Sequence, residues 1–335
     1  MPITQKRLPG AIWLGNPHWQ TIYPALLRAP LTLFRTRERL PTPDQDFLDL
    51  DWYGETGSDV VIILHGLAGS SESQYVTSLQ HLLRQQGFAS VALNFRGCSG
   101  QPNRLARSYH SGDTGDLNIV YRRLRHRFPQ AKLSAVGFSL GGNVLLKWLG
   151  EQGEQLDLTA AVAVSVPLVL SECADRMDSG FSKFYSAYLL AELRRYIGKK
   201  RVFLDAQGLD AEAEKLRNLG DLRRLKSFWQ YDDQVTAPLH GFAGVDDYYR
   251  RSSSRQFLGR IAVPTLLIQA EDDPFMTRAV LPAPAELAAP VTLELYDRGG
   301  HVGFLDGVGR KAPHSWLDKR IAAYLLERHA GSIRL

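Results

Sequence analysis

The sequence predicts an α/β fold, in which a mostly parallel sheet carries helices on both of its faces. Seven short apolar runs have the length and the Val, Ile and Leu content of strands buried on both faces. Helix-length segments lie between these runs, and this alternation is typical of strand–helix–strand units with parallel pairing. The predicted strands cover residues 47–54, 59–66, 88–97, 132–139, 158–167, 265–272 and 292–300.

The segments between the strands predict several helices and one large insertion. Helical spacing of apolar residues occurs in 73–87, 114–128, 141–153 and, near the end of the chain, 315–329. From 169 to 255 no strand-like run occurs and the pattern is helical, which predicts an insertion between two strands that covers the functional site as a lid. We therefore expect an N-terminal extension (1–45) packed on a core of 46–168 and 256–335, with the lid at 169–255.

Composition excludes several classes of protein. With 44% hydrophobic and 22% charged residues among 335, the chain is close to globular averages, which argues against disorder and against a small disulfide scaffold. Its two cysteines, Cys98 and Cys173, have neither CxxC spacing nor a nearby histidine cluster, so we expect no zinc site and no disulfide framework. Cys98 is interpreted as a structural thiol. These features favour a reducing compartment, the cytoplasm.

The net charge of +5 does not indicate a nucleic-acid partner. The basic residues of 122–127 and 193–201 alternate with Leu, Tyr and Ile, as is typical of a solvated helix face, and no nucleic-acid-binding motif accompanies them. The longest nearly uncharged apolar run, 161–170, is too short to span a bilayer, and the N-terminus lacks the pattern of a secretion signal. Peripheral contact with a membrane surface stays open.

The segment AVGFSLGGN (135–143) places a serine between glycines where a strand is expected to end and a helix to begin. Its residues 137–141 fit G-x-S-x-G, in which the serine lies on a sharp turn with its hydroxyl exposed. Gly137 and Gly141 are expected because a side chain at either position would strike the neighbouring strand or helix. Ser139 is therefore the candidate nucleophile, and the backbone N–H of Leu140 is one candidate oxyanion donor.

The segment HGLAGS (65–70) ends another predicted strand and continues as a loop of small residues. Such a loop can bring a second backbone N–H group close to the same serine, and Leu67 is the candidate for this oxyanion donor. The side chain of His65 is interpreted as a buried, hydrogen-bonded group that shapes the loop.

A serine nucleophile needs a base, and the base needs an acid that orients it. Of the nine histidines, His301 is the one on a glycine-flanked loop between the last strand and the closing helix, so it is the candidate base. The acid is expected in the loop after the preceding strand. Asp273 is favoured there because Pro274 fixes the turn after it, but the neighbouring carboxylates stay open. These alternatives are Glu271 and Asp272, and more weakly Asp297.

Seven segments spread over nearly the whole chain carry a resemblance to a known family. They are NPHWQT (16–21), HGLAGS, NFRGCSGQPN (94–103), YHSGDTGD (109–116), GFSLGGN (137–143), QAEDDPFM (269–276) and GGHVGF (299–304). With these segments the chain resembles the α/β-hydrolases, and within them the fourth AB-hydrolase family of bacterial esterases, which is related to eukaryotic α/β-hydrolase domain lipases and acyltransferases. The resemblance implies the α/β-hydrolase fold and a catalytic triad at Ser139, Asp273 and His301.

Two of those segments have no chemistry that follows from their residues. NFRGCSGQPN ends a strand, and YHSGDTGD leads into a helix that Asp113 or Thr114 could cap. Turn formation and capping account for most of both segments, although their place at strand ends could also let them line the pocket.

These observations lead to the expectation of a serine hydrolase that cleaves carboxylic esters without a metal or an organic cofactor. The predicted lid is rich in Phe, Tyr and Leu and contains Met177, which favours an apolar acyl chain on a small-molecule ester. Transfer of the acyl group to another alcohol and cleavage of thioesters use the same residues and stay open. A non-catalytic binding protein on this scaffold is the alternative of another class, and the retained triad argues against it.

Overall fold

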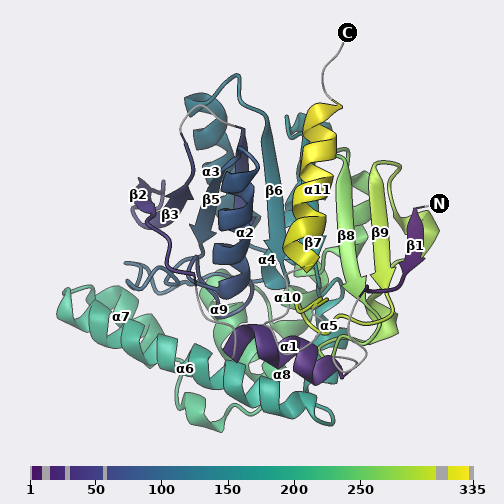
Figure 1. Cartoon of the computed structure of the whole chain (residues 1–335). Helices are drawn as coiled ribbons and strands as arrows, with labels where there is room; N and C mark the ends of the chain where they lie inside the picture. The colour runs from purple at the N-terminus through teal and green to yellow at the C-terminus, as the bar shows by residue number, and fades with distance from the viewer. Residues whose placement is uncertain (1, 10–15, 27–30, 56–58, 307–315, 332–335) are drawn as a thin grey trace.

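The computed structural model of the protein describes residues 2–9, 16–26, 31–55, 59–306 and 316–331 (Figure 1). Nine strands in this part of the chain form a single sheet in the order β1-β9-β8-β7-β6-β4-β5-β3-β2. The strands are β1 (Ile3–Lys6), β2 (Thr36–Pro41), β3 (Phe47–Tyr53), β4 (Val60–Leu64), β5 (Ala89–Asn94), β6 (Leu133–Phe138), β7 (Ala160–Val164), β8 (Thr265–Ala270) and β9 (Val291–Tyr296). All pairings from β1 to β5 along this order are parallel, whereas β3 pairs antiparallel with both β5 and β2.

Each of the seven predicted strands is present, and the α/β architecture is confirmed. The central strand β4 shows why the apolar runs are unbroken. Val60, Ile62 and Leu64 pack into the hydrophobic cluster on one face of the sheet, whereas Val61 and Ile63 pack into the cluster on the other. Because successive side chains of a strand point to opposite faces, a strand covered on both sides must be apolar at every position.

Both edge strands lie in the first 45 residues, and the apolar pattern does not predict either of them. β1 has four residues, and β2 has the charged sequence TRERLP with mostly exposed side chains. β2 is held instead by opposite charges across the strand pair. Arg37 lies opposite Asp51, with 2.8 Å between its Nε and Oδ1, and Arg39 lies opposite Asp49 at the same distance. Such cross-strand ion pairs favour pairing without apolar side chains.

Helices cover the two faces of the sheet. α2 (Gln74–Gln85) and α11 (Trp316–Ala330) pack side by side on one face (Figure 1). α3 (Thr114–Arg127) and α4 (Leu140–Gln152) pack against each other on the opposite face, where Leu117, Val144 and Trp148 enter the core. These are the four helices that the sequence predicts between and after the strands; residue 315, the expected first residue of the last one, lies outside the described residues.

The segment between β7 and β8 is helical, and no strand is found in it. It contains α5 (Leu170–Met177), α6 (Ser182–Ala206), α7 (Asp210–Arg217), α8 (Phe228–Tyr231), α9 (Ala237–His240) and α10 (Val245–Ser252). Leu190, Ile197 and Leu204 of α6 pack with Leu216 of α7 in a hydrophobic cluster separate from the two beside the sheet. These helices lie beyond the carboxyl ends of the parallel strands, and α1 (Pro17–Leu26) lies beside α6 (Figure 1).

Arg96 explains what the segments 94–103 and 109–116 do in the structure, which the sequence leaves open. Its guanidinium donates two hydrogen bonds of 2.8 Å to Asp116 at the start of α3, and it reaches Asp46 at 3.2 Å. The segments 94–103 and 109–116 are therefore joined by a buried, bidentate ion pair. The expected cap is wrong in one detail: Asp113 occupies the N-cap position of α3, but its carboxylate pairs with Arg107 and accepts no capping hydrogen bond.

None of the helices in the described ranges combines the length and the apolar character that crossing a membrane requires.

Replacing Arg96 by Met should lower the free energy of unfolding by about 3–5 kcal/mol, because the buried carboxylates of Asp46 and Asp116 lose their cation. Urea denaturation followed by circular dichroism measures the change. Arg223→Met is the control: Arg223 is exposed and pairs with Asp221 on the surface, so its loss should leave the stability nearly unchanged. Equal effects of the two substitutions would contradict the assignment.

Candidate active site

Ser139 lies at the turn where β6 ends and α4 begins, with a φ of +51° and a ψ of −118°. A positive φ is uncommon for residues other than glycine and persists when surrounding contacts hold it. Here the Ser139 N–H donates to the Val164 carbonyl at 2.8 Å, and the Ser139 carbonyl accepts from the Asn143 N–H at 3.0 Å. These two hydrogen bonds therefore hold the backbone of Ser139 in this conformation, and the turn sets the direction of its side chain.

The glycines around Ser139 are required by the closeness of the neighbouring backbone. A Cβ added to Gly137 would lie 2.5 Å from the carbonyl oxygen of Gly141. A Cβ on Gly141 would lie 2.5 Å from the His65 carbonyl oxygen and 2.7 Å from that of Leu64. The absence of these side chains lets the start of α4 pack directly on the ends of β4 and β6.

The structure brings Ser139, His301 and Asp273 together. Nε2 of His301 is 2.9 Å from Oγ of Ser139, and Nδ1 of His301 is 2.9 Å from Oδ2 of Asp273. The second carboxylate oxygen of Asp273 accepts the Phe275 N–H at 2.8 Å, and the ring of Phe275 stacks on the imidazole with the centroids 4.0 Å apart. The imidazole is thus held by a hydrogen bond at each nitrogen and by a ring on its face.

The other three carboxylates considered from the sequence have different partners. Glu271 forms an ion pair with Arg278 at 2.9 Å. Asp272 accepts the Gly300 N–H at 2.9 Å, and burial raises the pKa of its carboxyl group. Asp297 accepts the Leu8 N–H at 2.9 Å. Among the four, Asp273 is the one in contact with His301.

Residues outside the predicted set hold the loop that carries His301. Thr21 Oγ1 accepts the His301 N–H at 2.9 Å, and Gln20 Oε1 accepts the Leu305 N–H at 2.8 Å. From the other side, Ser165 Oγ accepts the Val302 N–H at 3.0 Å. Gln20 and Thr21 belong to the NPHWQT segment, which the sequence singles out through the family resemblance alone, and Ser165 follows β7 without any signal in the sequence.

Leu67 and Leu140, the two candidate oxyanion donors, both line a cavity that also contains Ser139 and His301. The residues on either side of Leu67 are engaged, because the Gly66 N–H donates to the Tyr75 hydroxyl at 2.8 Å and the Ala68 N–H to the Tyr109 hydroxyl at 2.9 Å. Within the described residues, neither the Leu67 N–H nor the Leu140 N–H donates a hydrogen bond. Two free backbone donors therefore lie on the wall that holds Ser139.

His65 has the structural role that the sequence indicates. Its Nδ1 is 2.8 Å from the Gly66 carbonyl oxygen, and its Nε2 accepts the Phe95 N–H at 3.1 Å. Burial lowers the pKa of His65 to about 4, so the ring is neutral near pH 7. It joins the end of β4 to the end of β5 and shapes the loop that carries Leu67.

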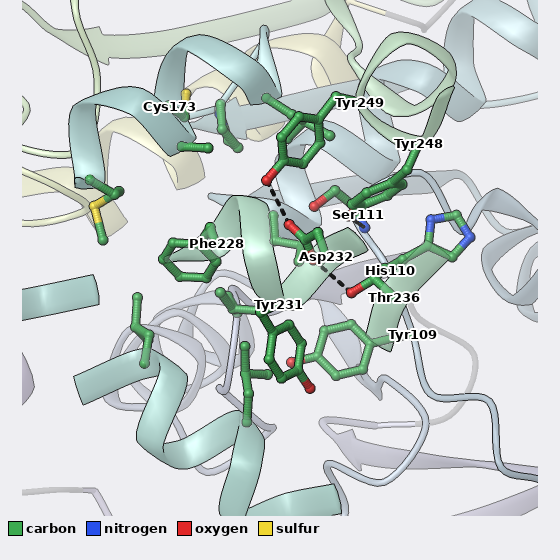
Figure 2. Close-up of a pocket in the computed structure, with 18 of the residues that line it drawn as sticks. Tyr109, His110, Ser111, Cys173, Phe228, Tyr231, Asp232, Thr236, Tyr248 and Tyr249 are labelled. Carbon is green, nitrogen blue, oxygen red and sulfur yellow. Dashed lines mark hydrogen bonds between the residues drawn. The ribbon is translucent and has the colours of Figure 1, made fainter. Parts of the chain in front are cut away.

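The cavity has a volume of about 140 Å³, and most of its wall is apolar. Helices α5 and α6 contribute Leu170, Cys173, Met177, Leu189 and Ile197, and α8 contributes Phe228. Figure 2 shows part of this lining, including a group of tyrosines around Asp232. An apolar space of this size beside Ser139 can hold a short hydrocarbon chain or part of a longer one.

Gly141→Ala should lower the free energy of unfolding by at least about 2 kcal/mol, because the new methyl group would overlap two backbone carbonyl oxygens. Gly198→Ala in α6 is the matched control, since its methyl group would meet nothing within 4 Å. Alanine is the better helix former, so this control should be neutral or stabilising by up to about 1 kcal/mol. Thermal denaturation of both variants gives the comparison, and similar melting temperatures would argue against the close packing at Gly141.

The sequence matches a family model and several known proteins. The family model described as "alpha/beta hydrolase fold" matches residues 59–308. The chain is 40% identical to YheT of Escherichia coli (strain K12), which is provisionally named an esterase, and the match covers 93% of this chain and 90% of that protein. It is 28% identical to phospholipase ABHD3 of Bos taurus, with coverage of 92% and 75%. A monoacylglycerol lipase of Saccharomyces cerevisiae is 31% identical, with coverage of 81% and 59%.

Solved structures show the same fold. The esterase Pf2001 of Pyrococcus furiosus superposes with a TM-score of 0.52 at 18% identity, covering 97% of this chain and 99% of that one. Est1E of Butyrivibrio proteoclasticus gives a TM-score of 0.51 at 14% identity, covering 88% and 99%.

Proposed function

This chain belongs to the α/β-hydrolase family as an esterase-like enzyme, and we propose that it cleaves carboxylic esters through an acyl-enzyme formed on Ser139. The observation that carries the proposal is the pair of 2.9 Å contacts that His301 makes with Ser139 and Asp273. This arrangement supplies a nucleophile, a base in hydrogen-bond reach of it, and a carboxylate that orients the base.

In the first half of the proposed reaction, Ser139 Oγ attacks the ester carbonyl carbon while His301 Nε2 takes the hydroxyl proton. The carbonyl oxygen becomes an oxyanion, to which the N–H groups of Leu67 and Leu140 donate. Collapse of the intermediate breaks the bond to the alcohol oxygen, which receives the proton from His301. Water then attacks the acyl-enzyme by the same sequence of proton transfers and releases the acid and free Ser139.

The position of Asp273 supports a role in orienting the imidazole of His301 and stabilising its charged form. Its side chain is 2% exposed, and its contact with Nδ1 fixes which imidazole nitrogen carries the proton before the reaction. The carboxylate then stabilises the imidazolium that forms when Ser139 is deprotonated. Each oxyanion donor should lower the barrier as well, since removing one such donor typically costs about 10²- to 10³-fold in rate.

The cavity supports an ester with an apolar acyl chain as the substrate class. Its lining from α5, α6 and α8 is mainly Leu, Met, Phe and Ile, and it reaches the nucleophile. We take 169–255 as a helical lid over a core of 46–168 and 256–335, with 1–45 as an N-terminal extension packed on that core. We place the enzyme in the cytoplasm, which is consistent with its two free thiols, Cys98 and Cys173.

A fluorophosphonate probe should label the wild-type protein, and Ser139→Ala should abolish the labelling, because the probe reacts with an activated serine. His301→Ala should reduce the hydrolysis of 4-nitrophenyl butyrate by about 10³-fold or more, since the base is lost. In-gel fluorescence and absorbance at 405 nm are the measurements.

Ser179→Ala is the control, because Ser179 is an exposed serine between α5 and α6 that does not line the cavity, so this variant should keep full labelling. Labelling of Ser139→Ala at the wild-type rate would contradict the proposal. Product analysis with water, an alcohol and an acyl thioester in competition separates hydrolysis from acyl transfer and from thioesterase activity, and a protein that neither labels nor turns over any of them would be a binding protein.

We also propose that this enzyme meets lipid surfaces through an exposed aromatic patch formed by Trp19, Phe181, Phe184 and Tyr188. Their side chains are exposed by 55%, 48%, 68% and 63%. The patch joins α1 to α6, because the His18 ring lies 4.2 Å from that of Phe181, which in turn lies 5.0 Å from that of Phe184. Exposed aromatic clusters of this kind mark interaction sites and favour the membrane–water interface.

The charges and the place of the patch favour an anionic bilayer as the partner. Lys199 is exposed further along α6, at helical spacing from Tyr188. Arg195, between them on the same face, is also exposed and forms an ion pair with Glu192. Behind the patch, Tyr185 contacts Phe275 with ring centroids 5.0 Å apart, and Phe275 stacks on His301. A lipid bound at the patch would therefore lie close to the proposed base.

The double substitution Phe184→Ser/Tyr188→Ser should reduce binding to vesicles of phosphatidylglycerol by about tenfold or more, because two interfacial aromatic side chains are lost. Vesicle co-sedimentation measures the binding, and hydrolysis of soluble 4-nitrophenyl butyrate should be unchanged. Val202→Ser is the control on the same helix, at an exposed position 14 residues beyond Tyr188. Unchanged vesicle binding, or a concentration-dependent dimer that the double substitution abolishes, would contradict the lipid surface and would favour a second copy of the chain.

A further inference from the structure

The cavity contains a carboxylate that the proposed ester hydrolysis does not use. Asp232 is the first residue of a π-helical turn, η4 (Asp232–Thr236), and it lines the same cavity as Ser139 and His301. Turns of this type are rare and occur frequently at functional sites. Figure 2 shows Asp232 in the middle of the cavity lining, with the dashed hydrogen bonds to Thr236 and Tyr249.

Both hydrogen-bond donors to Asp232 are neutral. Thr236 Oγ1 donates to Oδ1 at 2.6 Å, and the Tyr249 hydroxyl donates to Oδ2 at 2.8 Å. Each carboxylate oxygen can accept a further hydrogen bond. No cation of the described residues forms an ion pair with Asp232, and burial raises the pKa of its carboxyl group to about 6. An ionised carboxylate in an apolar space is unfavourable in free energy when no cation lies beside it. A ligand that carries a cation removes this free-energy penalty.

The two imidazoles in the wall do not supply the missing charge. His110 and His240 line the cavity with their ring centroids 4.8 Å apart. Burial lowers the pKa of both side chains, so both are neutral near pH 7. His240 Nδ1 is 2.8 Å from the carbonyl oxygen of Thr236 in η4, so the neutral His240 ring donates its proton to that oxygen. The cavity therefore carries an uncompensated negative charge at Asp232.

Aromatic rings surround this carboxylate. Tyr109, Phe228, Tyr231, Tyr248 and Tyr249 all line the cavity and lie around Asp232 (Figure 2). The faces of aromatic rings attract cations, and a desolvated ammonium group gains more from them than an exposed one does. A site with one carboxylate and several aromatic rings therefore favours the binding of a cationic nitrogen over that of a hydroxyl group.

We propose that Asp232 and the rings around it form a binding site for a cationic amine on the part of the ester that enters the cavity. This inference rests on the proposed ester hydrolysis, because it places the amine-bearing part of the substrate beside Ser139. The carboxylate accepts a hydrogen bond from the ammonium group, and the rings of Phe228 and Tyr231 contact its hydrocarbon neighbours. The enzyme therefore prefers amine-bearing esters over uncharged esters of the same length.

Direct binding to the Ser139→Ala protein tests the site without any turnover. Isothermal titration calorimetry at pH 7.5 should give hexylamine, which is charged, an affinity about tenfold higher than hexan-1-ol, its uncharged match. Asp232→Asn in the same background should abolish this difference, because the amide keeps the shape of the carboxylate and loses its charge. Asp233→Asn is the matched control, since Asp233 is exposed and does not line the cavity.

The outcomes separate this inference from the proposed function. Equal affinities for amine and alcohol in the Ser139→Ala protein would overturn the amine site even if the wild-type enzyme hydrolyses esters, and this comparison does not depend on how Asp232→Asn folds. An amine preference that survives in Asp232→Asn, with a melting temperature equal to that of its parent, would overturn the role of Asp232. Tight amine binding by a protein without esterase activity would support the site and contradict the proposed reaction.

Discussion

The close contact between the start of α4 and the ends of β4 and β6 is the constraint on which the rest of the site depends. The backbones approach so closely that Gly137 and Gly141 leave no space for a Cβ, and the residue between them has to take a positive φ. The same contact exposes the N-terminus of α4, with its free N–H groups, to the cavity. Strain in one residue is thus stabilised by the packing of three elements of the core.

Removal from water determines which side chains in and near the cavity beside Ser139 are charged. Burial lowers the pKa values of His65, His110 and His240, so imidazoles that lie near the cavity stay neutral. Burial acts in the opposite direction on Asp232, whose pKa it raises to about 6. A largely apolar wall therefore contains neutral rings and a carboxylate whose nearest hydrogen-bond donors are hydroxyl groups.

The parts of the structure that could be predicted are those with a local signal. Strands buried on both faces are continuous apolar runs, and the glycine pattern around Ser139 reflects contacts within a few residues of it. β1 and β2 could not be predicted because edge strands need no apolar face, and β2 pairs through Arg37 and Arg39. Similarly, adjacent carboxylates look alike in a sequence, and only the course of the loop brings Asp273 rather than Asp272 to His301.

The hydrogen bond from the His301 backbone to Thr21 constrains when the site can form during synthesis of the chain. Residues 20 and 21 leave the ribosome long before the loop that they hold, and β1 likewise has to wait for β9, its partner in the sheet. The geometry around Ser139 can therefore be completed only after some 280 intervening residues have been synthesised. A nascent chain that already contains the serine turn therefore still lacks the His301 loop that contacts it.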